Sequence, residues 1–274
     1  MNSVTSRAPS APGALRLGLA RTGIELKMFF RERDSVVFTF AFPVILLFIF
    51  GSVFTGDIAG GVSFKQYFTA GMLASGIVLS SFQSLAISIA TEREDGTLKR
   101  LRGSPMPPSA YFLGKIGLVV VSSLIQAAVL LVVGAAVFGL DLPTAGTAWL
   151  RFAWIFLLGT TAGTVLGIAY SSLPRSAKSA AAVVSPVVIV LQFVSGVYFV
   201  YGEIPSWMQT LGALFPLKWL AQGMRSVFLP MSFESAEVGG SWQTPQTALV
   251  LGAWAVLGLL VCLRTFRWSR RDAG

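Results

Sequence analysis

The charged side chains that could do chemistry gather in one short stretch of this sequence. Residues 91–105, TEREDGTLKRLRGSP, hold seven charged residues among fifteen, between two runs of more than twenty residues without charge. The sequence contains no histidine, which removes the commonest general base and transition-metal ligand. Its single cysteine, Cys262, excludes a disulfide framework or a cysteine-rich metal site. Most hydrolase chemistry is therefore disfavoured, although carboxylate or Ser–Lys chemistry stays formally open.

The order of charges in this stretch predicts a short helix. Acids precede bases, which complements the helix macrodipole: Glu92, Glu94 and Asp95, then Lys99, Arg100 and Arg102. Asp95 or Thr97 can cap such a helix, and Gly96 permits the bend in front of it. Prolines at 105, 107 and 108 end the helix, and Ser109 can cap the span that follows.

Two leucines of this helix suggest what it contacts. Leu98 and Leu101 lie three residues apart and therefore share one face. We expect both to be exposed, as in a helix that inserts into a groove on a partner protein. The alternative is a charged loop that only enforces membrane topology.

The composition predicts the elements that position this loop. The chain has 274 residues, of which 54% are hydrophobic and 12% charged, against about 25% charged in soluble domains. Six windows without charge each exceed the roughly 20 residues that span a bilayer as a helix. The sequence therefore predicts an all-α integral membrane protein with spans at about 35–55, 67–91, 110–139, 149–172, 180–200 and 246–264.

The basic residues predict the orientation of these spans. The net charge is +9, and seventeen of the 21 lysines and arginines fall on the side of the N-terminus. The exceptions are Lys65, Arg151, Lys218 and Arg225. By the positive-inside rule both termini are cytoplasmic, in a multi-pass protein of the cell membrane, and the charge indicates no nucleic-acid partner. The first apolar window begins too late for a cleaved signal peptide.

Segments outside the spans complete the predicted organisation. Residues 1–13 and 267–274 are expected as cytoplasmic tails, the first disordered. Residues 14–34 resemble an amphipathic helix that lies along the inner leaflet, with an ordinary cytosolic helix as the alternative. Residues 35–266 form a single transmembrane domain. Within it Gly159, Gly163 and Gly167 recur every four residues, which predicts close helix packing inside one subunit, or less favourably a dimer seam.

The segment between the fifth and sixth spans is not a polar loop. Residues 203–229 predict two short helices broken at Pro216, each too short to cross a bilayer. They are expected to dip into the membrane from outside. A surface hairpin without a role in transport is the alternative. The residues singled out in this segment are Trp207, Pro216, Trp219 and Arg225.

The string EREDGTLKRLRGSP, followed by SAYFLGK, resembles the first cytoplasmic loop of type-2 ABC exporter permeases. A second string, LFPLKWLAQGMRSVFL at 214–229, is similar to the re-entrant extracellular helices before their last span. The resemblance covers essentially the whole chain. The daunorubicin-type drug-resistance permeases are the subgroup most similar in character.

This resemblance implies a permease whose charged helix couples it to a separate ATPase subunit.

 The chain would form a homodimer and bind two copies of that ATPase, which alone would hold ATP and Mg. The sequence contains no G-x-x-x-x-G-K-[ST] phosphate loop, so we expect no enzyme activity and no cofactor in this chain. The implied interface residues are Glu92, Glu94, Asp95, Gly96, Thr97, Leu98, Lys99, Leu101 and Arg102.

In the family that the chain resembles, spans two and five line the substrate path. The polar and aromatic residues of these segments here are Phe82, Gln83, Gln192, Phe193, Tyr198 and Phe199. No acid or base is expected deep in a span, which argues against a proton-coupled carrier. Each glutamine could instead form an interhelical hydrogen bond.

The function that these features predict is the export of hydrophobic drugs or lipid-like molecules, with membrane lipid around the chain. Export of polysaccharide or glycolipid by a permease of the same class is one alternative. A membrane scaffold that docks a cytosolic partner without transport is another.

Overall fold

The computed structural model describes residues 13–54 and 56–266, and over these ranges the chain is helical, with a single isolated β-bridge between Asp57 and Ser63. Six of its helical segments are long and apolar enough to cross a membrane, which confirms the predicted fold class. They are α2 (Arg33–Val53), the continuous segment α3–η1–α4 (Phe64–Val78, Leu79–Ser84 and Leu85–Glu94), α6 (Pro108–Phe138), α7 (Gly146–Tyr170), α8 (Ala177–Val194) and α11 (Thr244–Thr265).

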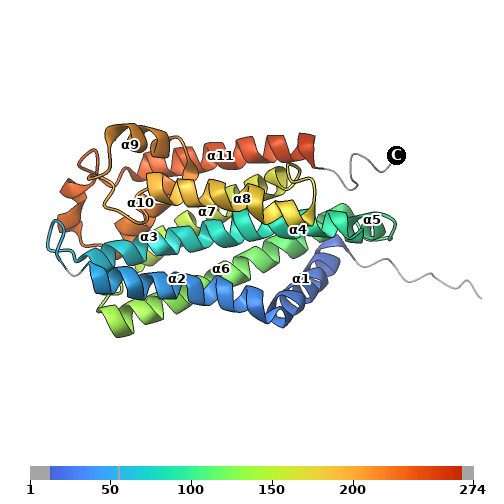
Figure 1. Cartoon of the computed structure of the whole chain (residues 1–274), viewed down its shortest axis with the longest axis horizontal. Coiled ribbons are helices and arrows are strands. Elements are labelled where there is room, and N and C mark those ends of the chain that lie inside the picture. The colour runs from blue at the N-terminus through green and yellow to red at the C-terminus, as the bar shows by residue number, and fades with distance from the viewer. Residues whose placement is uncertain (1–12, 55, 267–274) are drawn as a thin grey trace, which may run out of the picture.

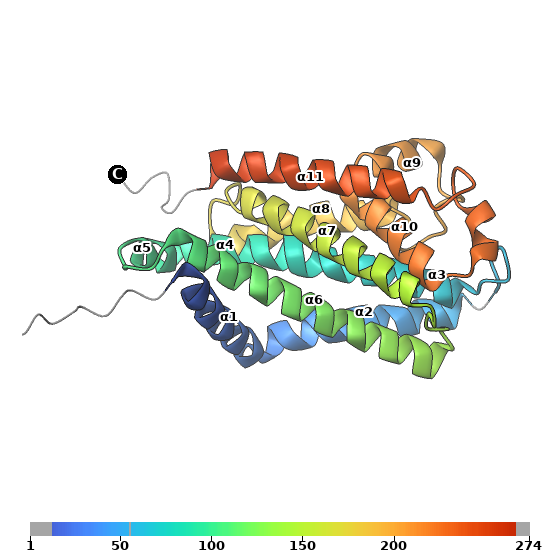
Figure 2. The ribbon, with the colours of Figure 1, turned by 180° about the vertical axis from the view of Figure 1, so that it is seen from behind.

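The six long segments run side by side, and the short elements lie at the two ends of the bundle (Figures 1 and 2). At one end are α1 (Ala14–Arg31) and α5 (Thr97–Arg102). At the other are α9 (Ser206–Ala213), α10 (Pro216–Phe228) and the 3₁₀ turn η2 (Met231–Ala236). The first residue of α1 and the last of α11 therefore lie toward the same end. The expected tails, apart from Gly13, lie outside the described residues.

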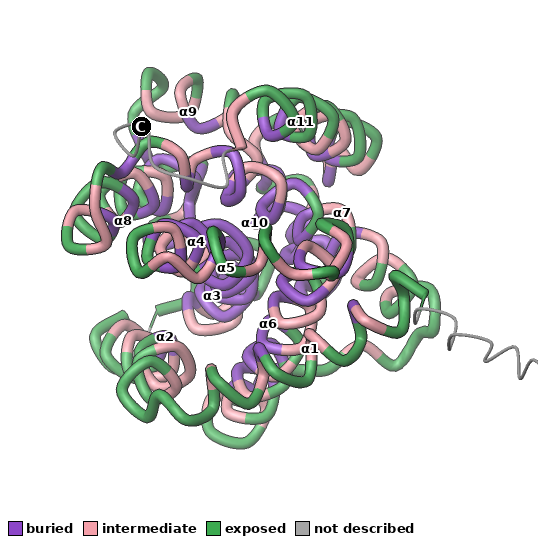
Figure 3. The backbone as a smooth tube through the Cα atoms, turned by 90° about the vertical axis from the view of Figure 1, so that its right-hand side faces the viewer, coloured by how far each residue is buried: buried purple, intermediate pink, exposed green. Residues whose placement is uncertain are grey.

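The second long segment forms the centre of the bundle. In its most apolar window 72% of residues are buried, more than in any of the other five. Figure 3 shows α3 and α4 surrounded by neighbouring helices. A π-helical turn, η1, interrupts this segment halfway along.

The glycines of α7 pack against this π-helical turn. A Cβ atom on Gly167 would lie 2.8 Å from the backbone oxygen of Ser81, and one on Gly163 would meet the Ser81 side chain. Gly159 lies against Leu220 of α10. The predicted close packing within one subunit is confirmed, because only a hydrogen at these positions leaves room for the neighbouring helix.

Helix α1 packs against α6, and the chain bends where α1 is followed by α2. Gly18 lies against Leu113, and Thr22 lies against Gly117 and places its Oγ1 3.4 Å from the Leu113 carbonyl oxygen. A single residue, Glu32, separates α1 from α2. The exposed side of α1 keeps large apolar side chains, among them Leu15, Leu19, Met28 and Phe30.

Helix α8 ends earlier than the sequence predicts. It stops at Val194 rather than near residue 200, and the chain turns at Gly196, whose φ is +69°. Pro216 occupies the first turn of α10, which confirms the two helical pieces separated there. Helix α10 is buried along almost its whole length against α3, α7 and α11, so it is not a surface hairpin. Trp219 and Arg225 are buried in it, whereas Trp207 of α9 is exposed.

Candidate functional site

The charged stretch folds into the short helix α5 that its charge order predicts. Asp95 Oδ1 accepts a hydrogen bond from the Thr97 backbone N–H at 2.9 Å, so Asp95 satisfies the first N–H of α5 from one residue ahead of the N-cap position, which Gly96 occupies. Gly96 has a φ of +77°, a left-handed conformation that turns the chain from α4 into α5. Helix α5 ends at Arg102, and Pro108 opens α6. The predicted capping role of Ser109 is wrong, because α6 already begins at the preceding proline.

The leucines of α5 do not form an exposed face. Leu98 is fully buried in an apolar cluster that includes Ile89, Tyr111 and Ile168, and Leu101 is half-buried beside it. The expectation that both are exposed is wrong, because α5 folds back over the ends of α4, α6 and α7. Its exposed surface is charged and consists of Lys99, Arg100 and Arg102, next to Glu94 and Asp95.

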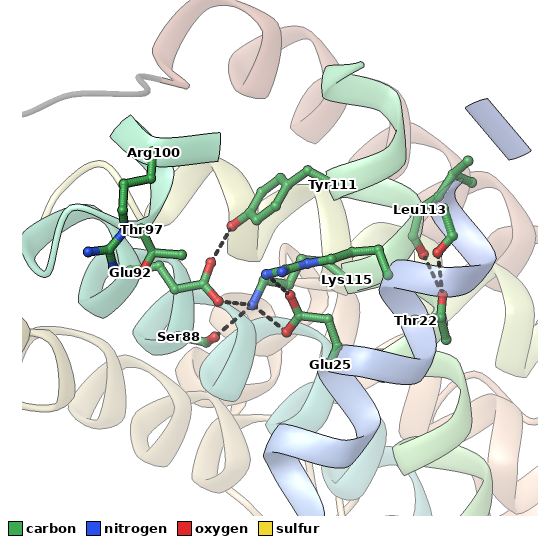
Figure 4. Close-up of polar contacts among 11 residues, drawn as sticks. Thr22, Glu25, Ser88, Glu92, Thr97, Arg100, Tyr111, Leu113 and Lys115 are labelled. Carbon is green, nitrogen blue, oxygen red and sulfur yellow. Dashed lines mark hydrogen bonds and ion pairs between the residues drawn. The ribbon is translucent and has the colours of Figure 1, made fainter. Parts of the chain in front are cut away.

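Glu92 lies inside the bundle and joins α4 to α6. Its Oε2 accepts a hydrogen bond from the Tyr111 hydroxyl at 2.8 Å, and its Oε1 lies 2.5 Å from Lys115 Nζ (Figure 4). The Lys115 ammonium also donates to Glu25 Oε2 at 2.9 Å and to Ser88 Oγ at 3.0 Å. Three elements, α1, α4 and α6, therefore meet at one buried ammonium group.

This buried cluster includes residues that the sequence analysis missed. Lys115 is fully buried, Glu25 is 3% exposed, and Arg21 lies 2.5 Å from Glu25 on the same helix. The sequence analysis counted Lys115 only as a topology signal. The feature that could have revealed its role is its position two turns inside α6, because a charge there requires a buried partner.

The next two residues of α4 contact two further helices. Arg93 NH1 donates to the Ser171 carbonyl oxygen at 2.5 Å, and its NH2 donates to the Ser171 hydroxyl at 3.1 Å. Ser171 ends α7, where a cation is favoured by the helix dipole. Glu94 Oε2 accepts from the backbone N–H of Ala177, the first residue of α8, where an anion is favoured.

Glu92, Arg93 and Glu94 together tie α4 to its surroundings. Successive helical residues point about 100° apart, so three in a row reach three different neighbours. The neighbours are α6 (and through Lys115 also α1), α7 and α8. The end of α4, from which α5 continues, is therefore held by charged contacts to four other helices.

Most of the predicted substrate-path residues are used in packing. Gln83 Nε2 lies 3.3 Å from Ser185 Oγ and links η1 to α8. Gln192 is buried, donates to Ser75 Oγ at 2.5 Å and accepts from the Tyr198 hydroxyl at 2.6 Å. Phe82 is buried against Tyr170. Phe193 and Phe199 are each 41% exposed, so these two aromatic rings are the accessible part of the set.

The opposite end of the bundle is fixed by a second buried charge pair. Arg225 of α10 is fully buried, pairs with Glu237 and lies over the Tyr67 ring. Nearby, Lys218 donates to Gln222 Oε1 at 2.5 Å and lies over the Trp219 ring. Burial lowers the pKa of Lys218 to about 8, helped by the Arg225 charge and opposed by Glu237. Burial raises the pKa of Tyr201 to about 12.

These features define a helical membrane permease with a charged helix at one end and a buried short helix at the other. The chain belongs to the ABC-2 type transporter family, whose model matches residues 20–229. The matched segment is the membrane part of such a transporter and holds no nucleotide-binding domain. ABC-2 permeases work with ATP-binding cassette subunits and carry no cofactor of their own. No group of acids or cysteines among the described residues could hold a metal ion.

Curated relatives are distant but carry consistent names. The chain is 21% identical to the putative transport permease YvfS of Bacillus subtilis, over 86% of this chain and 91% of that protein. It is 23% identical to the probable multidrug ABC transporter permease YbhR of Escherichia coli, over 70% of this chain and 50% of that protein. It is 26% identical to the putative transport permease ycf38 of Porphyra purpurea, over 73% of this chain and 70% of that protein.

Proposed function

We propose that this chain is the permease of an exporter that moves hydrophobic drugs or lipid-like molecules out of the cytoplasm or the inner leaflet. In this proposal α5 is the coupling helix, and two copies of the ATP-binding subunit dock on a homodimer of the chain. ATP and Mg are bound by those subunits. The chain resides in the cell membrane with α5 and both termini in the cytoplasm, as the distribution of its lysines and arginines favours.

The observation that carries the proposal is the anchoring of α4 by Glu92, Arg93 and Glu94. A helix that only marked topology would need charge but no such connections. In this arrangement a displacement of α5 would be transmitted to α6, α7, α8 and α1 through hydrogen bonds and ion pairs. The π-helical turn η1 supplies an irregular point at which α4 can move relative to α3.

The roles of the individual coupling residues follow from their exposure. Lys99, Arg102 and Asp95 are exposed and are proposed to contact the ATPase subunit, together with Arg100. Glu92 and Leu98 are buried and position the helix from within. Gly96 and Thr97 shape its start. Helix α1 is proposed to lie along the inner leaflet on its exposed apolar side chains.

The proposed substrate class rests on the apolar character of the accessible path residues. Phe193 and Phe199 present aromatic surface at the end of α8. The word multidrug in the name of YbhR agrees with a hydrophobic cargo. Helices α9 and α10 are proposed to close the outer end of the path, held by the Arg225–Glu237 pair.

The test is purification of the chain from its native membranes in mild detergent, with mass spectrometry of the proteins that accompany it. We expect a stoichiometric subunit with a phosphate-binding loop. It should be lost when Lys99, Arg100 and Arg102 are all changed to glutamate. The matched control reverses three other exposed cations toward the same end, Lys27, Arg31 and Arg33, and should keep the subunit. A chain that purifies alone, without an ATPase subunit, would contradict the proposal.

A further inference from the structure

Helices α10 and α5 lie toward opposite ends of the bundle (Figure 1). At the α10 end there is a hollow of about 410 Å³. It is bounded by the beginning of α7, the turn η2, the loop before α11 and the first turn of α11. The residues that line it include Arg151, Glu234, Trp242, Gln243 and Gln246. None of these residues has a part in the coupling arrangement described above.

Two opposite charges line this hollow without meeting each other. Arg151 NH1 donates to the Ser226 carbonyl oxygen at 2.8 Å, and Glu234 Oε1 accepts from the Trp242 backbone N–H at 3.1 Å. Between the described residues no ion pair joins Arg151 to Glu234. Each is therefore held in place by backbone, and a ligand with both a negative and a positive group can satisfy both.

A buried indole and the start of a helix lie next to these charges. Trp242 is 4% exposed, and its indole Nε1 has no hydrogen-bond partner within the described part of the chain. A buried indole N–H normally has an acceptor. The first turn of α11 begins here without a side-chain cap, and its N-cap residue, Gln243, has a φ of +48°. Arg151 and this helix start favour an anion, whereas Glu234 favours a cation.

The surroundings indicate that the ligand also has an apolar part. Met231, which lines the hollow, is 67% exposed. Leu249, one turn after Gln246 on α11, is 71% exposed. A hollow with two opposite charges that do not pair with each other, and with exposed apolar side chains beside it, matches the headgroup and upper chains of a phospholipid.

We propose that this hollow binds one zwitterionic phospholipid headgroup from the leaflet at the α10 end. The phosphate would lie toward Arg151 and the start of α11, and the ammonium toward Glu234. The acyl chains would lie along Met231 and Leu249. This inference does not depend on the substrate, direction or ATPase partner proposed above.

The experiment is native mass spectrometry of the purified full chain in detergent, titrated with phosphatidylethanolamine or phosphatidylglycerol. We expect phosphatidylethanolamine to bind about tenfold more tightly. Arg151→Gln should weaken both lipids, whereas Glu234→Gln should weaken phosphatidylethanolamine alone and so remove the preference. Soluble phosphoethanolamine should compete only weakly, and inorganic phosphate not at all, if the source is a lipid rather than a free phosphoester.

Matched controls are Lys65→Gln and Glu203→Gln, which remove the same charges toward the same end but outside the hollow. Both should keep the preference. Equal binding of the two lipids to the unaltered chain would overturn the proposal. So would a preference that survives Glu234→Gln. Because Glu234→Gln is expected to retain phosphatidylglycerol, that retention separates lost recognition from a misfolded chain.

Discussion

Lys115 Nζ lies 2.5 Å from Glu92 Oε1, inside the bundle and near the end of α4, the helix that precedes α5. The same ammonium contacts Glu25 of α1, so it joins two buried carboxylates from separate helices, and Glu25 pairs with Arg21 as well. The arrangement fixes where α4 ends relative to α6 and α1. It therefore determines the position of the charged helix that follows.

Removing the Lys115 charge is expected to destabilise the chain strongly. Lys115→Met leaves Glu25 and Glu92 buried beside each other without their shared partner, a change that costs about 3–5 kcal/mol in comparable buried pairs. Thermal unfolding in detergent, followed by tryptophan fluorescence, measures the effect. Lys178→Met, at an exposed lysine, should leave the midpoint unchanged. Equal midpoints for the two variants would contradict the buried cluster.

Leu98 is expected to act through stability rather than through docking. Leu98→Ala removes a fully buried side chain and should cost about 2–5 kcal/mol. Leu101→Ala, at a half-buried position, should cost less. The same unfolding assay compares them. A larger loss of stability for Leu101→Ala would contradict the finding that Leu98 is the more deeply buried of the two leucines.

The glycine that faces the π-helical turn is expected to tolerate no side chain. In Gly167→Ala the new Cβ would lie 2.8 and 2.9 Å from the backbone oxygens of Ser81 and Phe82, so one helix must shift, at a cost of about 1–3 kcal/mol. Gly252→Ala is the matched control, because no atom lies within 4 Å of its Cβ. It should be neutral or stabilising by up to about 1 kcal/mol. Similar midpoints for both variants would rule out close packing of α7 on η1.

The lowered pKa of Lys218 predicts that stability rises with pH. Its pKa is about 8 in the folded chain and 10.5 in its ordinary state, so between these values the unfolded chain binds more protons. Unfolding midpoints should therefore increase from pH 8 to pH 9.5, and Lys218→Met should remove this increase. The window stays below the range in which Tyr201, with a pKa raised to about 12, reverses the slope. A midpoint that falls over this window in the unaltered chain would contradict the assignment.

The sequence alone was sufficient to predict the helices. It was insufficient to predict which side chains are buried between them. Long uncharged windows identify spans because bilayer thickness sets their length, and Asp95, Gly96 and Pro216 mark local backbone geometry that depends on neighbours in the chain. The burial of Leu98 was not predictable in this way, because two leucines three residues apart indicate a shared helix face but not whether that face is exposed or buried. Lys115 and Glu25 are 90 residues apart, and no local pattern pairs them.

The same distinction between local and long-range features holds for the site residues. The charged character of α5 follows from composition alone, but the separate destinations of Glu92, Arg93 and Glu94 depend on where α6, α7 and α8 end in space. Gln192 and Tyr198 were predicted along the substrate path; in the structure Gln192 donates to Ser75 and accepts from the Tyr198 hydroxyl. The alternative of an interhelical hydrogen bond was therefore correct for Gln192.

The most direct test of the coupling proposal is the number of substrate molecules exported per ATP hydrolysed, measured in vesicles that contain the chain and its ATPase subunit. Changing Arg93 and Glu94 together to glutamine removes the charged contacts to α7 and α8 while leaving Lys99, Arg100 and Arg102 for docking. We predict that the subunit still binds and hydrolyses ATP but that this ratio falls at least tenfold, whereas Lys178→Gln leaves it unchanged. An unchanged ratio in the double variant would contradict the claim that α5 drives the bundle through these contacts.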